Sequence, residues 1–122
     1  MKMMTLVMAI FLTWAVNAYG GTLFTATLWA VAPDGFACNL TNVGHKARSV
    51  RIRIITDGTI LLDSGEISLA PRHTTDHVVN GLEEGGPIYC EFTVEGSEKE
   101  YRGAAKLFRL PNSSDFAVVP AQ

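Results

Sequence analysis

The chain has 122 residues, of which 18% are charged and 48% are hydrophobic, and its formal net charge at pH 7 is −2. This length is sufficient for one domain with a hydrophobic core and too short for two domains of ordinary size. The slightly acidic balance argues against a general affinity for nucleic acid or for anionic membranes.

Residues 1–18 have the pattern of a secretory signal peptide. Lys2 gives a positive start, residues 3–16 are almost wholly apolar, and small residues then fit a cleavage site before Tyr19. The apolar run is shorter than the roughly 20 residues that a membrane span needs. We therefore expect a secreted or periplasmic protein with a single domain over residues 19–122 and no membrane span after cleavage. The alternative is an uncleaved membrane anchor.

Cleavage before Tyr19 would change the composition of the chain. All four Met residues lie in the removed segment, and the loss of Lys2 leaves nine Lys plus Arg against twelve Asp plus Glu. Two cysteines remain, Cys38 and Cys90, and an even count in an exported chain predicts a disulfide. The alternative is a pair of buried free thiols.

The rest of the chain alternates between short runs rich in Val, Ile, Thr and aromatic residues and turns rich in Gly, Asn, Asp and Pro. This pattern is typical of β-strands joined by tight turns. Residues 83–87 are expected to form an acidic, Gly-rich loop. In chain order, we expect strands at 22–32, 36–43, 48–56, 59–63, 66–69, 74–79, 88–94 and 101–110, followed by a short terminal strand at 116–119.

Two of these runs alternate clearly enough to assign their faces. Residues 88–94 place Cys90 on an inward face and Glu91 on an outward one. Asp57-Gly58, which follows the run 48–56, predicts a two-residue hairpin. In that other run, residues 48–56, the expected inward side chains are Val50, Ile52, Ile54 and Thr56, and the expected outward ones are Arg51, Arg53 and Ile55.

About seven or eight short strands with frequent turns predict an all-β fold, an antiparallel sandwich of the immunoglobulin-like or fibronectin III-like kind. Cys38 and Cys90 fall on inward positions of the second and the penultimate long strands, so their disulfide would join the two sheets. The markers of antibody domains are missing. The third strand carries no Trp, and the residue two before Cys90 is Ile88 instead of Tyr.

Several short motifs resemble those of the bacterial and archaeal CARDB-like sandwich modules. They are a T-N-x-G strand end at residues 41–44, an alternating strand at 50–54, the Asp57-Gly58 hairpin and an L-A-P turn at 69–71. Arg72 stands where that family has Gly, and the family's acidic, Asn-rich ending is absent. The resemblance implies a non-enzymatic adhesive or structural module. The chain is also similar to small secreted bacterial proteins that end in V-V-P-A-Q, which implies no particular function.

Few residues in the chain suggest catalysis, a cofactor or a metal. His73 and His77 share a face, but on a strand they would lie about 13 Å apart, too far for one ion. A copper site would need a free Cys and usually Met, and no arrangement of Ser, His and Asp predicts a nucleophile. We expect His73, Asp76, His77 and the pair Glu83-Glu84 to be solvated surface, and we expect no catalytic, cofactor or metal site.

Four cations, Lys46, Arg48, Arg51 and Arg53, lie within eight residues. One interpretation is a binding patch for an anionic polymer. The other is a structural role, in which Arg51 or Arg53 pairs with Glu91 or Glu95 on the outer face of one sheet. We favour the structural interpretation, and an uninterrupted cationic surface would contradict it.

Two classes of function remain after these exclusions. The first is a non-catalytic binding or structural module of the envelope or cell exterior, whose partner would be an envelope protein or an anionic polymer. The second is a small secreted inhibitor or effector that acts through its loops, above all residues 33–35 and 81–87. We do not expect an enzyme.

Overall fold

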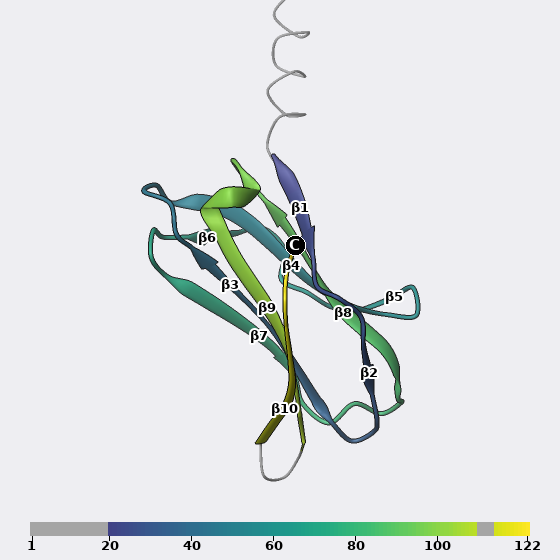
Figure 1. Cartoon of the computed structure of the whole chain (residues 1–122). Coiled ribbons are helices and arrows are strands. Elements are labelled where there is room, and N and C mark those ends of the chain that lie inside the picture. The colour runs from purple at the N-terminus through teal and green to yellow at the C-terminus, as the bar shows by residue number, and fades with distance from the viewer. Residues whose placement is uncertain (1–19, 110–113) are drawn as a thin grey trace, which may run out of the picture.

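The computed structural model describes residues 20–109 and 114–122, with side chains for 20–109 and 117–122. The expected signal peptide lies outside the described residues and stays a prediction. In the described part, ten strands and one short 3-10 turn follow each other along the chain (Figure 1). They are β1 (Gly21–Phe24), β2 (Leu28–Ala30), β3 (Gly35–Asn42), β4 (Arg48–Thr56), β5 (Thr59–Asp63), β6 (Ile67–Leu69), β7 (Thr74–Val79), β8 (Gly86–Val94), η1 (Glu98–Glu100), β9 (Tyr101–Arg109) and β10 (Ser114–Pro120).

The strands form two sheets with antiparallel pairings, as the sequence predicts. The sheet that we call the β4–β8 sheet has the order β1-β8-β4-β5, with β2 also paired to β8 and β6 paired to β4. The other, the β3–β9 sheet, has the order β10-β9-β3-β7. Because successive side chains of a strand alternate between its faces, each sheet turns one apolar face toward the other.

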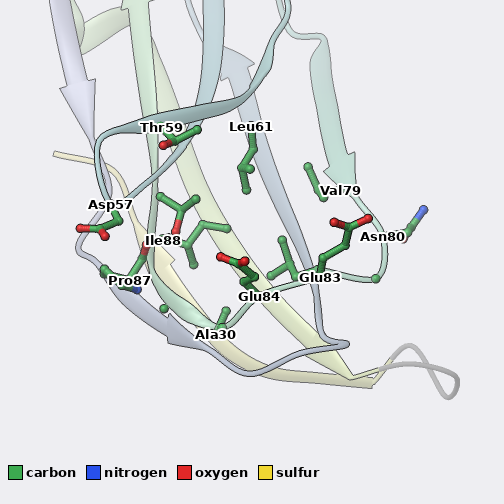
Figure 2. Close-up of a pocket in the computed structure, with 15 residues that line it drawn as sticks. Ala30, Asp57, Thr59, Leu61, Val79, Asn80, Glu83, Glu84, Pro87 and Ile88 are labelled. Carbon is green, nitrogen blue, oxygen red and sulfur yellow. Dashed lines mark hydrogen bonds between the residues drawn. The ribbon is translucent and has the colours of Figure 1, made fainter.

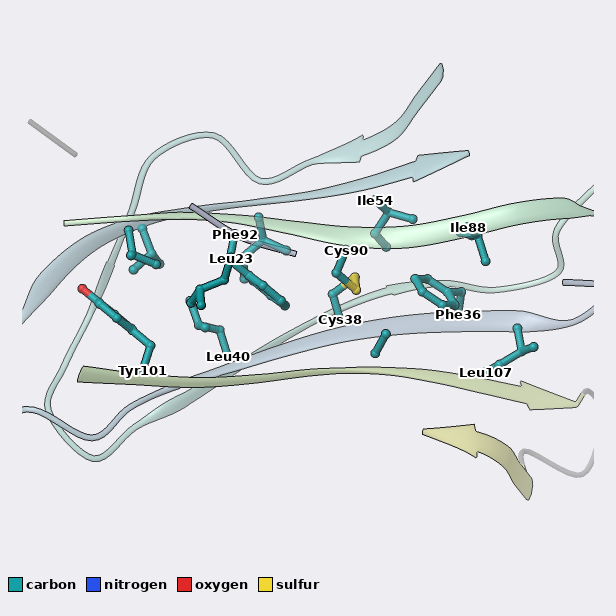
Figure 3. Close-up of a cluster of buried hydrophobic side chains, with 14 of the residues drawn as sticks. Leu23, Phe36, Cys38, Leu40, Ile54, Ile88, Cys90, Phe92, Tyr101 and Leu107 are labelled. Carbon is teal, nitrogen blue, oxygen red and sulfur yellow. A yellow bond between two sulfur atoms is a disulfide. The ribbon is translucent and has the colours of Figure 1, made fainter. Parts of the chain in front are cut away.

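The core lies between these two apolar faces (Figure 3). Alternation is as expected in β8 and in β4 as far as Ile54, but Ile55, expected to face outward, is buried. The β4–β8 pairing sets Ile52 opposite Phe92 and Ile54 opposite Cys90. The Cys38–Cys90 disulfide is present, with the two Cα atoms 5.9 Å apart, and it joins β3 to β8 across the core. The largest fully buried side chains are Phe36, Phe92, Leu40, Ile52, Ile54, Ile88 and Leu107.

The last long strand, β9, lies in a different place from the one that the immunoglobulin-type order would give it. In that order it would pair with β8, but it pairs with β3, and β1 lies beside β8 instead. The turn η1 carries the chain from one sheet to the other. There the buried hydroxyl of Tyr101 donates a hydrogen bond to the carbonyl of Glu95. Burial of this hydroxyl raises the pKa of Tyr101 to about 12.

One side of the sandwich is closed by main-chain hydrogen bonds between the ends of β1 and β10. The amide of Phe24 donates to Gln122, at 3.0 Å, and the amide of Gln122 donates back, at 2.9 Å. On the other side, β5 and β7 are sheet edges with no strand pairing between them in the described residues.

Several bounds of the expected elements need correction. The strand expected at 36–43 is Gly35–Asn42, and the terminal strand expected at 116–119 is Ser114–Pro120. The run 22–32 is two strands, because the chain stops pairing with β8 after Thr25. The amide of Thr25 donates to the Cys90 carbonyl, and the hydroxyl of Thr25 accepts from the Cys90 amide. The strand expected at 66–69 begins one residue later. The loop expected at 83–87 ends earlier, because Gly86 and Pro87 pair with β2 as the start of β8.

Candidate functional site

A groove of about 590 Å³ opens at one end of the sandwich, on the side where β5 and β7 are free (Figure 2). We call it the loop-end groove, and it is formed by residues 56–61, by residues 79–88 and by Ala30. Its lining is mixed. We use floor for its apolar side chains, which are Ala30, Leu61, Val79, Leu82 and Ile88, and rim for its acidic ones, which are Asp57, Glu83 and Glu84; Thr56, Thr59 and Asn80 also line it.

The hairpin on one wall of the groove follows from the predicted Asp57-Gly58 turn. Both residues have positive φ, 46° and 79°, which is the requirement of the tight turn that matches the twist of two antiparallel strands. The hydroxyl of Thr56 then donates to the carbonyl of Pro87, at 2.6 Å, and ties this hairpin to the start of β8. The hairpin is thus fixed relative to the opposite wall.

The opposite wall is the segment 80–87, which is also held in place. The amide of Leu82 donates to the carbonyl of Asp34, at 2.9 Å, and this bond joins the segment to the β2–β3 turn. At Gly85 the chain passes so close to Ala30 that an added Cβ would lie 2.8 Å from the Ala30 carbonyl oxygen. The two loops that the sequence singles out, 33–35 and 81–87, are therefore brought together.

A β-bulge supplies the most exposed apolar residue of the groove. The β4–β5 pairing sets Ile54 opposite Leu62 but Ile55 opposite Ile60, so Leu61 is an extra residue in β5. Leu61 is 42% exposed, and its side chain points into the groove in Figure 2. Sequence reasoning missed this residue, because Ile60, Leu61 and Leu62 form an apolar run without alternation.

The rim of the groove is negatively charged and unpaired. Asp57, Glu83 and Glu84 are exposed, and none of them has an ion-pair or hydrogen-bonding partner among the described side chains. No Lys, Arg or His lines the groove. These carboxylates therefore differ from those of Asp63, Glu91 and Glu100, which are paired with arginines.

The four cations singled out by the sequence lie elsewhere, and three of them are ion-paired. Arg51 contacts Asp63 at 2.6 Å, and Arg53 contacts both Asp63, at 3.3 Å, and Glu91, at 3.5 Å. The expected pairing of Arg53 with Glu91 on a mixed-charge face is thus confirmed. Hydrogen bonds from Arg51 and from the amide of Gly65 hold the pKa of Asp63 far below its usual range.

The remaining members of this group do not extend the face into a cationic surface. Arg48 is paired with Glu100 at 3.2 Å, at the end of the sandwich where η1 lies. Lys46 is exposed in the loop before β4, and its carbonyl accepts a hydrogen bond from Asn42. Lys46, Arg48, Arg51 and Arg53 therefore form no uninterrupted cationic patch.

The two histidines near β7 are hydrogen-bonded to different groups. His73 Nδ1 is hydrogen-bonded to the Pro71 carbonyl at 2.9 Å, and His77 Nε2 lies 3.3 Å from the Thr75 hydroxyl. Asp76 and His77 are neighbours on a strand, so they point to opposite faces. Across the described residues, no group of three or more His, Cys, Asp or Glu side chains is placed to hold a metal ion.

In the described part of the chain, no helix is long and apolar enough to cross a membrane. Comparison with protein-family models and with curated proteins finds no match. Among solved structures, the fold is similar to the crystal structure of Thermotoga maritima 1070, with a TM-score of 0.57 and 9% sequence identity. The similarity covers 87% of this chain and 94% of that one. At this identity it supports the sandwich fold alone.

Proposed function

We propose that this protein is a non-catalytic binding module of the cell exterior or periplasm, and that it engages an envelope protein through the loop-end groove. The observation that carries the proposal is the groove itself, which joins an apolar floor to a polar rim between two fixed walls. Concave sites of this kind, with a few polar groups around an apolar surface, are typical of binding sites. The disulfide supports an oxidising compartment outside the cytoplasm.

We also propose that the fold is related to the immunoglobulin-like and fibronectin III-like sandwiches, with one strand moved. The pairings β3–β7 and β4–β8 and the disulfide between the sheets support this relation. The place of β9 beside β3 is the departure. Modules of this class commonly bind through the loops at one end of the sandwich, which is where the groove lies.

The proposal is tested with a matched pair of substitutions at exposed apolar residues. Leu61→Asp places a charge in the groove, and Val118→Asp places the same charge on β10, where Val118 is 55% exposed. The purified protein is used to capture partners from an envelope extract, and a captured protein is then purified and its affinity measured with each variant. We expect Leu61→Asp to weaken binding at least tenfold, as loss of a central contact does, and Val118→Asp to leave it unchanged.

The opposite pattern of affinities would contradict the proposal, as would equal effects of the two substitutions. Thermal unfolding of both variants serves as the control for folding. If the captured partner is a single enzyme and the wild-type protein abolishes its activity through the same groove, the inhibitor alternative replaces the structural module.

A further inference from the structure

The loop-end groove has a charge pattern that limits what can occupy it. Its apolar floor is formed by aliphatic side chains, among them Leu61 on β5 and Val79 at the end of β7 (Figure 2). Around it, the charges are all of one sign. An apolar surface of this kind favours an aliphatic or aromatic group, and an acidic rim excludes a ligand that carries negative charge beside that group.

The three carboxylates come from both walls of the groove. Asp57 is at the tip of the β4–β5 hairpin, and Glu83 and Glu84 are on the segment opposite, where Figure 2 shows Glu84 below Leu61 and Glu83 toward Val79 and Asn80. No cation of the described chain neutralises them, in contrast to Asp63 and its two arginines. A ligand with positive charge would therefore gain attraction that the protein does not already supply to itself.

The spacing of these carboxylates argues against a metal ion as that ligand. They do not belong to any group of three acidic, His or Cys side chains that could hold an ion in the described residues. A rim that is spread around an apolar floor suits a longer ligand, whose charges are separated by apolar groups. Lys and Arg side chains meet this need, because their aliphatic stems lie on apolar surface while their charged ends remain in water.

We propose that the occupant of the groove is an extended peptide segment of the partner protein in which Lys or Arg flanks an aliphatic residue. The aliphatic side chain lies on the floor beside Leu61, and the cations lie near Glu83, Glu84 and Asp57. The volume of about 590 Å³ is within the range of sites for drug-sized ligands, which is enough for one or two side chains of such a segment. This inference rests on the proposed function, because it specifies the chemistry of the same groove.

The test uses three fluorescent hexapeptides with the same backbone length. The first alternates Lys with Leu, the second alternates Glu with Leu, and the third alternates Lys with Ser. Fluorescence polarisation with the purified protein should show binding of the Lys/Leu peptide. The affinities of the Glu/Leu and Lys/Ser peptides should be at least tenfold weaker. The affinity of the Lys/Leu peptide should also fall as NaCl rises, since exposed charges are screened.

Two double variants locate the effect. Glu83→Gln with Glu84→Gln removes two charges from the rim, and Glu66→Gln with Glu98→Gln removes two exposed charges away from the groove. We expect the first to weaken Lys/Leu binding at least fivefold and the second to change it less than twofold. Equal weakening by both would mean that net charge alone attracts the peptide, and it would overturn the proposal.

The outcomes separate this inference from the proposed function. In one outcome, Leu61→Asp abolishes binding of the envelope partner, but the Lys/Leu peptide does not bind and the Glu83→Gln, Glu84→Gln variant keeps full affinity for the partner. The groove is then the binding site, and the proposed class of ligand is wrong. If Leu61→Asp has no effect on the partner either, both fail. Displacement of the peptide by CaCl₂ beyond that by NaCl of equal ionic strength would assign the carboxylates to a cation and would also overturn the inference.

Discussion

The side chain of Asn42 is fully buried and donates a hydrogen bond to the main-chain carbonyl of Leu69, at 3.0 Å. Its second amide hydrogen goes to the carbonyl of Lys46, at 2.8 Å, and its Oδ1 accepts from the amide of Gly44, at 2.9 Å. One side chain thus joins the end of β3, the following loop and the end of β6. The T-N-x-G strand end seen in the sequence has this structural role.

We expect Asn42→Ala to destabilise the protein by about 3 kcal/mol, because three hydrogen bonds are lost and two carbonyls lose a partner in or near the core. Urea unfolding followed by tryptophan fluorescence measures the change. Asn39→Ala is the matched control, since Asn39 is half-buried on the outer face of β3. A similar loss of stability in both variants would contradict the assigned role of Asn42.

Arg72 has φ of 63°, in the left-handed region that an L residue with a side chain adopts at a cost. The CARDB-like pattern has Gly at this point, and the backbone here has the conformation that Gly favours. Arg72→Gly should therefore raise the free energy of unfolding by up to about 1 kcal/mol. Ala47→Gly, at an exposed loop position without positive φ, should lower it. A loss of stability in Arg72→Gly would refute this explanation.

The Cys38–Cys90 disulfide links residues that are 52 apart in the sequence. Closing a loop of this length is expected to stabilise the folded state by roughly 4 kcal/mol. Replacement of both cysteines by Ala should lower the melting temperature by roughly 15 °C or more, as scanning calorimetry would measure. The same fall should follow reduction of the wild-type protein, and an unchanged melting temperature after verified reduction would contradict the account.

Asp63 should make stability depend on acid pH. Its hydrogen bonds with Arg51 and Gly65 lower its pKa in the folded state below the ordinary value of 3.8. The stabilisation is therefore present above about pH 4 and is lost as the pH falls further. Because the side chain is 28% exposed, solvent screening makes the effect modest.

The measurement compares urea unfolding at pH 7 and pH 3. Asp63→Asn should be less stable than the wild type at pH 7, and the difference between the two proteins should shrink at pH 3. Asp76→Asn, in an exposed strand position, is the control for general charge effects. A difference between Asp63→Asn and the wild type that is the same at both pH values would rule out this coupling.

Local patterns predicted much of this fold, and the failures have physical causes. Alternation in 48–56 and 88–94 gave the buried faces apart from Ile55, because a period of two depends only on the strand itself. The ion pair of Arg53 with Glu91 also required the expectation that the two strands lie side by side in one sheet. The pairing of β9 with β3 could not be predicted, because alternation tells which way a side chain points and not which strand lies beside its own. The groove depends on a bulge at Leu61, which shows only when β4 and β5 are paired.

An NMR titration of the ¹⁵N-labelled protein with the Lys/Leu peptide tests directly whether the loop-end groove is the binding site. We expect amide shifts to concentrate at Leu61, Glu83, Glu84 and Ile88, around the groove, and to saturate with the affinity found by polarisation. Shifts confined to the mixed-charge face of Arg51, Arg53 and Asp63, with none around the groove, would contradict this expectation.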